Sequence, residues 1–460
     1  MAVVTEGDKR GPKYGARVLQ VEPYGAEVVA NAERHGTARQ QFTLWLGSNL
    51  TIADFALGFL PISLGMSWSL TIASILIGNI LGAAVLAGCS AMGPSYGAPQ
   101  LIIGRLTFGR VGGYLPALLN YVSTIGWFTV NNILGSFGLQ VLIPSLAFWQ
   151  GAVVLVVIQG LIAIYGHNLI HTYERVMSVV LGVLFAIATV IALMHHTSLT
   201  AYHPTVSQPW VLFAVMVAAA FSYIGSWGPY ASDYSRYLAK STRKTQVWGF
   251  AFLGSFLASV WLELVGAAVA VLAASTKGNP ISDLHTVMGG FGAVAVIAII
   301  LGGTAADALN LYSNSLAAGA MDIRLPRWTL AVVASVIGLG LSLYGSGHFE
   351  QNYENFLLML GYWFMPWLGV LFTDFYFMKR HRRASSDARM SARIGWSGLL
   401  SFLVGFGVSI PFMAASLYQG PIAKALHGAD LSFYVGFVVA GLCYFLVSKA
   451  NHSGVPRFRS

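Results

Sequence analysis

Stretches of about twenty apolar residues recur along the whole chain, and they constrain its fold more than any other feature. An α-helix needs about twenty such residues to cross the hydrocarbon core of a bilayer. With 56% hydrophobic and 9% charged residues, the 460-residue chain carries too few charges to cover the surface of a soluble globule. The sequence therefore predicts an all-α membrane protein that crosses the bilayer many times.

Twelve such stretches can be placed along the chain, and we expect each of them to form a transmembrane helix. The predicted first residues of these helices are Gln41, Ser67, Tyr114, Phe148, Tyr173, Pro209, Val247, Phe291, Trp328, Glu354, Ile394 and Asp430. The segments between the stretches are short, so there is no room for a soluble catalytic module or a lid domain. Any chemistry is expected within the membrane.

The basic residues predict the orientation, because Lys and Arg in short loops stay on the cytoplasmic side. With the N-terminus inside, 24 of the 26 Lys and Arg residues fall on the inner side, and only Lys277 and Lys424 fall outside. Both termini are therefore expected in the cytoplasm, and the short loops suit a bacterial inner membrane. The net charge of +9 then reflects topology, with lipid headgroups as partners and no nucleic acid.

Several function classes lack their signatures in this sequence. There is no Gly-x-x-x-x-Gly-Lys-Ser/Thr loop, so we do not expect this chain to pump a substrate with ATP. No nucleophile with a base and no set of metal ligands converge, so we expect neither an enzyme nor a bound cofactor. A transporter driven by an ion gradient and an uncoupled channel or facilitator remain.

The sixth apolar stretch is interrupted by Gly225, Gly228 and Pro229, and it carries the aromatic residues Tyr223 and Trp227 at the interruption. A helix that loses its hydrogen-bond ladder inside a membrane is tolerated where protein or a cavity satisfies the backbone, as at transporter sites. The alternative is a helix that ends early. In the first interpretation, either aromatic residue could form one wall of a binding slot.

The third stretch places Trp127 and Asn131 four residues apart, and therefore on one face of a helix. An aromatic plate beside an amide suits a flat heterocycle, which needs apolar area against its ring face and hydrogen-bonding groups at its edge. Packing and interfacial belts account for most membrane tryptophans, but Trp127 lies deep in its predicted helix. We therefore expect a planar substrate here.

The first stretch carries the polar residues Ser48, Asn49, Thr51 and Asp54 within two helical turns. We assign Asn49 to the substrate and the other three to a co-transported cation. A buried carboxyl group in a membrane helix marks a functional site unless it is hydrogen-bonded to a neighbouring helix, and that structural role is the alternative for Asp54. Glu263 in the seventh stretch is interpreted as a hydrogen-bonded acid for which a proton role stays open.

The eighth stretch carries a continuous polar stripe, with Thr304, Asp307, Asn310 and Asn314 at steps of three, three and four. Four polar groups including an acid exceed what helix packing requires, so we expect this face to line a site. Hydroxyl and carboxyl oxygens of the first and eighth helices would suit sodium, and either aspartate could instead carry a proton. Thr304 and Asp307 are thus assigned to the cation and Asn310 to the substrate.

Several stretches of sequence together resemble the nucleobase/cation symporter family, in its purine and cytosine permease branch. The matching segments are residues 21–27 (VEPYGAE), 97–100 (GAPQ), 105–109 (RLTFG), 227–237 (WGPYASDYSRY), 310–313 (NLYS) and 428–436 (GADLSFYVG). Each motif is short, but they occur in order across nearly the whole chain.

The resemblance implies a LeuT-like fold of two inverted five-helix repeats plus two peripheral helices, with the first and sixth helices discontinuous. The expected organisation is an N-terminal tail (1–40), a transport core (41–378), a basic loop (379–393), helices 11 and 12 (394–449) and a C-terminal tail (450–460). Alternating access would then arise from rocking of the core around a site at the membrane midplane.

The resemblance also implies roles for single residues. Trp127 and Asn131 match the family's aromatic and amide positions, Asn310 matches its substrate amide, and Thr304 matches a sodium hydroxyl. Ala305 lacks the second hydroxyl of sodium-coupled relatives, so sodium and proton both stay open, and sodium at Thr304 is the one metal expected.

We therefore predict a symporter that imports a planar nucleobase, cytosine or a purine, with a cation. Hydantoin, allantoin or a vitamin-like heterocycle is the alternative substrate, and an uncoupled facilitator is the alternative class.

Overall fold

The computed structural model describes residues 25–165, 167–194, 201–273, 279–378 and 393–453. Most of the predicted N-terminal tail, nearly all of the basic loop 379–393 and residues 454–460 lie outside the described residues. The described part is almost entirely helical, with one two-residue hairpin in which β1 (Ala414–Ala415) pairs antiparallel with β2 (Tyr418–Gln419).

Long helices occupy the predicted apolar stretches. They are α1 (Gln40–Asn49) with α2 (Ile52–Ser63), α3 (Trp68–Ser90), α6 (Tyr114–Leu142), α7 (Phe148–Tyr165), α8 (His167–Met194), α10 (Pro209–Gly225) with η2 (Gly228–Tyr230) and α11 (Ala231–Ser235), α12 (Lys244–Ala273), α14 (Gly292–Ala320), α15 (Arg327–Gly345), α16 (Phe349–Phe372), α18 (Trp396–Ser409) and α20 (Ser432–Ser453). The shorter helices are α4 (Gly93–Tyr96), α5 (Gln100–Phe108), α13 (Pro280–Val287) and α19 (Pro421–Ala425).

The helices begin close to their predicted first residues, and the largest difference is in α8, which begins at His167 instead of Tyr173. Hydropathy locates the part of a helix that lies in hydrocarbon, whereas the hydrogen-bond ladder continues into polar residues at its ends. The prediction therefore started this helix too late.

Seven helices within the described residues are long and apolar enough to cross a membrane, or eight when the bent pair α1 and α2 counts as one span. Twelve spans were expected. α7 and α18 contain shorter apolar segments, α15 and α16 form one continuous apolar stretch, and α6 carries many Asn, Ser, Thr and Gln residues. The protein is thus a multi-pass membrane protein.

The first apolar stretch is broken into α1 and α2, which meet at an angle of 55°. Thr51 has an extended backbone conformation between the two helices, and its hydroxyl oxygen accepts a hydrogen bond from the backbone N–H of Asp54 at 3.3 Å. The backbone N–H of Leu50 still reaches the carbonyl oxygens of Leu46 and Gly47. Two backbone N–H groups at the break thereby find partners within the protein.

The sixth stretch is interrupted at the position that Gly225 to Pro229 predicted. The α-helix α10 ends at Gly225, a single 3-10 turn follows at Gly228–Tyr230, and α11 resumes at Ala231. Pro229 has no backbone N–H to continue the α-helical ladder. Residues 209–235 nevertheless form one span, and the sharp bend of 55° is confined to the break between α1 and α2.

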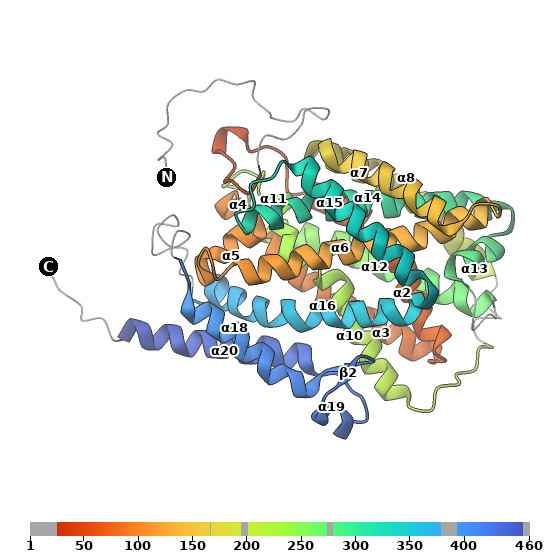
Figure 1. Cartoon of the computed structure of the whole chain (residues 1–460). Helices are drawn as coiled ribbons and strands as arrows, with labels where there is room; N and C mark the ends of the chain where they lie inside the picture. The colour runs from red at the N-terminus through yellow and green to blue at the C-terminus, as the bar shows by residue number, and fades with distance from the viewer. Residues whose placement is uncertain (1–24, 166, 195–200, 274–278, 379–392, 454–460) are drawn as a thin grey trace.

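The broken helices lie inside the bundle, where α10 packs along α3 and α14 packs along α6. In Figure 1, α18 and α20 lie together along one flank beside α16, while α4, α5 and α11 gather at one end and α13 lies at the other. This arrangement places both breaks next to α6 and α14.

Candidate substrate-binding site

A small cavity lies where the two breaks meet α6 and α14. Its lining consists of Thr51, Ala53, Trp127, Asn131, Tyr223, Trp227, Ala306 and Asn310. Its volume is about 10 Å³, which is room for about one water molecule. A heterocyclic ring is far larger, so these side chains must move apart to admit one. Asn49 is the only residue predicted to bind the substrate that does not line this cavity.

The aromatic side chains of Trp127, Tyr223 and Trp227 form the walls of the cavity. The ring centroids of Trp127 and Tyr223 are 5.2 Å apart at an interplanar angle of 88°, and Phe356 packs on Trp127 in a similar edge-to-face contact at 5.1 Å. The indole N–H of Trp127 donates to the Ser226 hydroxyl at 3.0 Å. Because its polar atom is satisfied by the protein, the ring of Trp127 can offer its apolar face to a ligand. Tyr223 and Trp227 both line the cavity, so the structure keeps both as wall residues.

Two hydrogen bonds join the break of the first helix to that of the sixth. The indole N–H of Trp227 donates to the Asn49 side-chain oxygen at 3.1 Å. The hydroxyl oxygens of Thr51 and Tyr223 lie 2.9 Å apart. All four side chains are buried, where such bonds are costly to break. A movement of one break is therefore transmitted to the other.

The two amides of the cavity share one carboxyl oxygen. The side-chain N–H groups of Asn131 and Asn310 donate to Asp307 Oδ1 at 2.9 and 3.4 Å. Tyr230 donates to the Asn310 side-chain oxygen at 3.4 Å. The Asn131 side-chain oxygen has no partner among the described residues although it is buried. Asp307 thus fixes Asn131 so that an unused hydrogen-bond acceptor is available at the cavity.

The five residues assigned to the cation do not form one cluster. The Ser48 hydroxyl donates to the backbone carbonyl of Leu44 at 2.6 Å. Thr51 lines the substrate cavity, and Asp307 holds the two amides. Asp54 and Thr304 have separate surroundings.

The hydroxyl of Thr304 donates to the Leu301 carbonyl at 2.7 Å and lies 2.8 Å from the hydroxyl of Tyr173 on α8. Asp54 lies instead beside Glu263 of α12.

Sequence reasoning missed several residues that complete the site. Ser226 and Tyr230 belong to the broken segment already singled out, so their position near the break was a usable signal. Ala53 and Ala306 contribute only small surfaces, and Tyr173 and Phe356 come from distant helices. No sequence pattern identifies these last four residues as part of the site, because their roles depend on how the helices pack.

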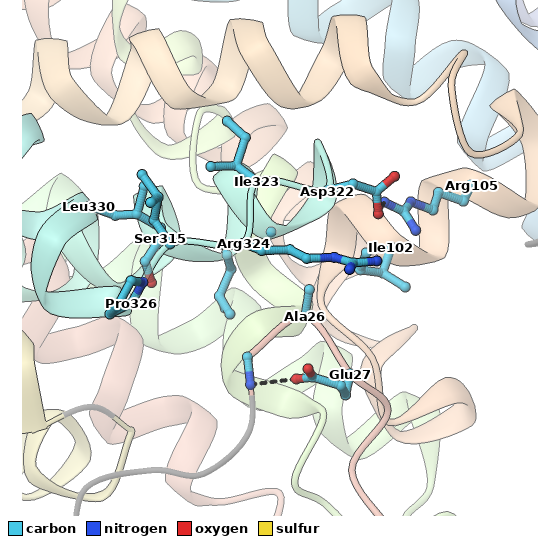
Figure 2. A pocket seen from close by; sticks show the side chains of 14 residues that line it. Ala26, Glu27, Ile102, Arg105, Ser315, Asp322, Ile323, Arg324, Pro326 and Leu330 are labelled. Atoms are coloured by element: carbon cyan, nitrogen blue, oxygen red, sulfur yellow. Dashed lines mark hydrogen bonds and ion pairs between the residues drawn. The ribbon is translucent and has the colours of Figure 1, made fainter. Parts of the chain in front are cut away.

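A larger cavity of about 570 Å³ lies at the end of α14, where residues 25–27 approach α5 and the α14–α15 connection. Figure 2 shows the Asp322 carboxylate facing Arg105, with Arg324 extending toward Ile102. Its lining contains no aromatic residue, so it offers no surface on which a planar ring could stack. It lies on the side predicted to be cytoplasmic.

Asp322 holds this end of the bundle together. It accepts hydrogen bonds from Arg105 at 3.1 Å, from Arg110 at 2.7 Å and from the Tyr114 hydroxyl. Burial opposes ionisation of Asp322, but these hydrogen bonds outweigh it and lower the pKa of the carboxyl to about 2. The ion pairs tie α5 and the loop that precedes α6 to the end of α14.

Comparisons with known proteins identify relatives of this chain. A family model for permeases for cytosine/purines, uracil, thiamine and allantoin matches residues 28–436. The Bacillus subtilis protein YxlA is 28% identical over 445 residues, which cover 94% of this chain and 96% of YxlA. The purine-cytosine permease fcyB of Emericella nidulans is 25% identical over 454 residues, which cover 93% of this chain and 88% of fcyB.

Among solved structures, the transporter Mhp1 of the nucleobase-cation-symport-1 family has the same fold. Its closed conformation with bound bromovinylhydantoin superposes with a TM-score of 0.76 at 17% sequence identity. The match covers 96% of this chain and 98% of Mhp1. The LeuT-like fold that the family resemblance implied is confirmed, whereas the count of twelve helices and the arrangement of the repeats stay predictions.

Proposed function

Because this chain belongs to the family of permeases for cytosine/purines, uracil, thiamine and allantoin, we propose that it is a symporter that imports cytosine or a purine with a cation. Membership of the family makes the chain a transporter of the nucleobase type and not an enzyme. The proposal adds the substrate, the coupling to a cation and the direction of transport.

The observation that carries the proposal is the cavity between the two broken helices. Trp127, Tyr223 and Trp227 supply aromatic surfaces, and Asn131 and Asn310 supply hydrogen-bonding groups from two further helices. A planar ring uses both kinds of group, since its faces are apolar and its edge is polar. A channel would need a continuous path, whereas these side chains close tightly around about 10 Å³.

The hydrogen bonds of Asp307 favour a particular edge of the substrate. They leave the Asn131 side-chain oxygen as an acceptor, which pairs with an N–H group of the ring or its exocyclic amine. Cytosine and the purine bases carry such groups. Hydantoin and allantoin carry them too, so the choice among these heterocycles is left to the transport test.

Alternating access follows from the bonds between the breaks. Substrate entry would separate the walls of the cavity, and the Trp227–Asn49 and Thr51–Tyr223 bonds would carry that change into both broken helices. We propose that twelve helices, arranged as two inverted repeats of five plus two peripheral helices, rock around this site. The termini would face the cytoplasm of a bacterial cell, because the basic residues are concentrated on that side.

The cation is proposed to be a proton or sodium. For sodium, Thr304 would be a ligand, as the family resemblance implies. Its hydroxyl is already bonded to Tyr173 and to the Leu301 carbonyl, and Ala305 offers no second hydroxyl. Sodium prefers several oxygen ligands, so this arrangement supports a proton more than sodium.

Uptake into proteoliposomes tests the proposal. Radiolabelled cytosine and hypoxanthine are offered under an imposed proton or sodium gradient, with hydantoin, allantoin, thiamine and uracil as competitors. We expect accumulation above the external concentration, abolished when the gradient is collapsed. Accumulation that persists without any gradient, or mere equilibration under both gradients, would contradict symport. Trp149→Ala, at a tryptophan of α7 that is 56% exposed, serves as a control for the Trp127→Ala variant.

A further inference from the structure

Two buried carboxyl groups face each other between α2 and α12, apart from the substrate cavity. Asp54 and Glu263 are at most 1% exposed, and the two carboxyl groups lie beside each other. Neither carboxyl oxygen of Asp54 has a hydrogen-bond partner among the described residues. The sequence marked both as intramembrane acids but gave no reason to pair them.

The surroundings of the pair consist of polar, uncharged side chains. Asn79 of α3 donates a hydrogen bond to Glu263 at 2.9 Å. The Ser259 hydroxyl, fully buried on α12, lies beside Asp54. These side chains can stabilise a carboxyl group in either protonation state, because a hydroxyl both donates and accepts and an amide offers both groups.

Within the part of the chain that the structure describes, no cationic side chain balances the two acids. Tyr223 of α10 and Tyr353 of α16 are the other titratable groups whose electrostatic interaction reaches the pair. The helices α2, α3, α6, α10, α14 and α16 contain no Lys or Arg, and Lys244 lies at the far start of α12. Apart from tyrosines and Cys89, the remaining described side chains on the packed helices that titrate or carry charge are Asp307 of α14, Glu174 and Arg175 of α8, Asp283 and His285 of α13, and Glu350 and Glu354 of α16.

Two adjacent carboxylates without a balancing cation repel each other, so the pair holds a proton as long as α2 lies against α12. The close approach of the two helices makes their packing sensitive to that proton. A Cβ atom added at Gly58 of α2 would lie 2.0 Å from the Glu263 carbonyl oxygen, and one at Gly266 of α12 would lie 2.1 Å from that of Phe55. The backbones thus touch at the level of the acids, and repulsion between two carboxylates would separate them.

The pair is also connected to the substrate cavity. Asp54 lies in the first turn of α2, which Thr51 caps, and Thr51 is bonded to the wall residue Tyr223. Tyr353 donates to the backbone carbonyl of Ala53 at 2.9 Å, and Ala53 lines the cavity. A displacement of α2 from α12 would therefore move two residues of the cavity lining.

We propose that Asp54 and Glu263 form the proton-binding site of this transporter, distinct from Thr304, and that a proton shared by the two carboxyl groups holds α2 against α12 and closes the cavity on its substrate. The inference deepens the proposed function and rests on it. Proton and substrate then raise each other's affinity, because each favours the same position of α2. Loss of the proton leaves both acids ionised and loosens α2.

The test uses the full-length chain in proteoliposomes with the heterocycle that the competition panel identifies. Glu263→Gln keeps the shape of the side chain and its bond with Asn79 but removes one carboxyl group. We expect this variant to exchange labelled for unlabelled substrate while its accumulation under a proton gradient falls to the equilibrium level. Glu263→Asp, which restores a carboxyl group, should recover part of the accumulation. Glu350→Gln, at an exposed residue of α16, is the matched control.

A second measurement follows the proton itself. Substrate is added to the purified protein in weakly buffered detergent solution with a pH indicator. The parent protein should take up protons on binding substrate, and both Glu263→Gln and Asp54→Asn should take up none. A monodisperse elution profile shows that each variant is folded, and the parent and Glu350→Gln should behave alike.

Three results would overturn the inference. Accumulation and proton uptake that remain at the parent level in Glu263→Gln and Asp54→Asn would exclude the pair. Loss of coupling in Glu174→Gln together with retention in Glu263→Gln would place the proton at another carboxyl. Transport driven by sodium alone would reject the inference and leave the proposed symport standing, whereas a folded parent that transports no heterocycle would reject the proposed function itself.

Discussion

Replacing Asp307 by Asn should change which edge of a heterocycle the site prefers. In the parent protein, Asp307 Oδ1 accepts hydrogen bonds from the side chains of Asn131 and Asn310, at 2.9 and 3.4 Å. The carboxyl group thereby directs both amide N–H groups away from the substrate and leaves the Asn131 oxygen as an acceptor. In Asp307→Asn, the new amide can itself donate to that oxygen, which would no longer be available to the substrate.

The magnitude follows from the loss of one hydrogen bond to a substrate N–H group. Such a bond contributes about 1 kcal/mol net. Because 1.4 kcal/mol corresponds to a tenfold change in affinity, we expect about a fivefold loss for substrates that donate to Asn131. A heterocycle of similar size without N–H groups loses no bond at this position, so its affinity should stay constant or rise.

Competition in the proteoliposome assay measures this selectivity. The inhibition constants of cytosine and of a pyrimidine without N–H donors are compared between the parent and Asp307→Asn. Asn314→Ala is the control, because Asn314 lies on the same helix but donates to Tyr121 and Thr124. If the ratio of the two constants is the same in the parent and in Asp307→Asn, the orientation assigned to Asn131 is wrong.

Three further predictions concern other parts of the structure. Trp127→Ala removes an aromatic wall worth about 1 kcal/mol, so the transport affinity should fall at least fivefold in folded protein; an unchanged affinity refutes the role. Trp227→Phe leaves the Asn49 oxygen without its donor and should cost about 1 kcal/mol of stability, seen as a lower melting temperature in detergent. Asp322→Asn should lower the free energy of unfolding by about 1 kcal/mol after allowance for the partial exposure of Asp322, and it should therefore also lower the melting temperature. Because its folded pKa of about 2 lies below the ordinary 3.8, this stabilisation is complete above pH 3.8 and disappears as pH falls through 2; a difference from the parent that does not shrink on acidification contradicts it.

Local sequence patterns predicted those parts of the site that depend on a single helix. The spacing of Trp127 and Asn131 placed both on one face, and Gly225 to Pro229 predicted an interruption because proline cannot continue the ladder. The break between α1 and α2 has no such marker. It forms at Thr51, whose hydroxyl can cap a helix but does so only where neighbouring helices satisfy the freed backbone.

Contacts between distant segments could not be read from the sequence. Asp54 and Glu263 are separated by more than two hundred residues, and Thr304 meets Tyr173 across two helices. From the sequence we assigned Asp307 to the binding of a cation. In the structure, one oxygen of its carboxyl group accepts hydrogen bonds from the side-chain amides of Asn131 and Asn310. Residue type and helical periodicity define a face, but the partner of that face depends on the packing of the whole bundle.

We propose above that a heterocycle binds between the two broken helices. The most direct test of this proposal is an experimental structure of the protein with the heterocycle that the competition panel identifies. The account predicts the ring against Trp127, with an N–H group at the side-chain oxygen of Asn131 and the cavity enlarged around it. A ring bound instead in the cavity beside Arg105 and Asp322, or one in contact with neither Trp127 nor Asn131, would contradict the account.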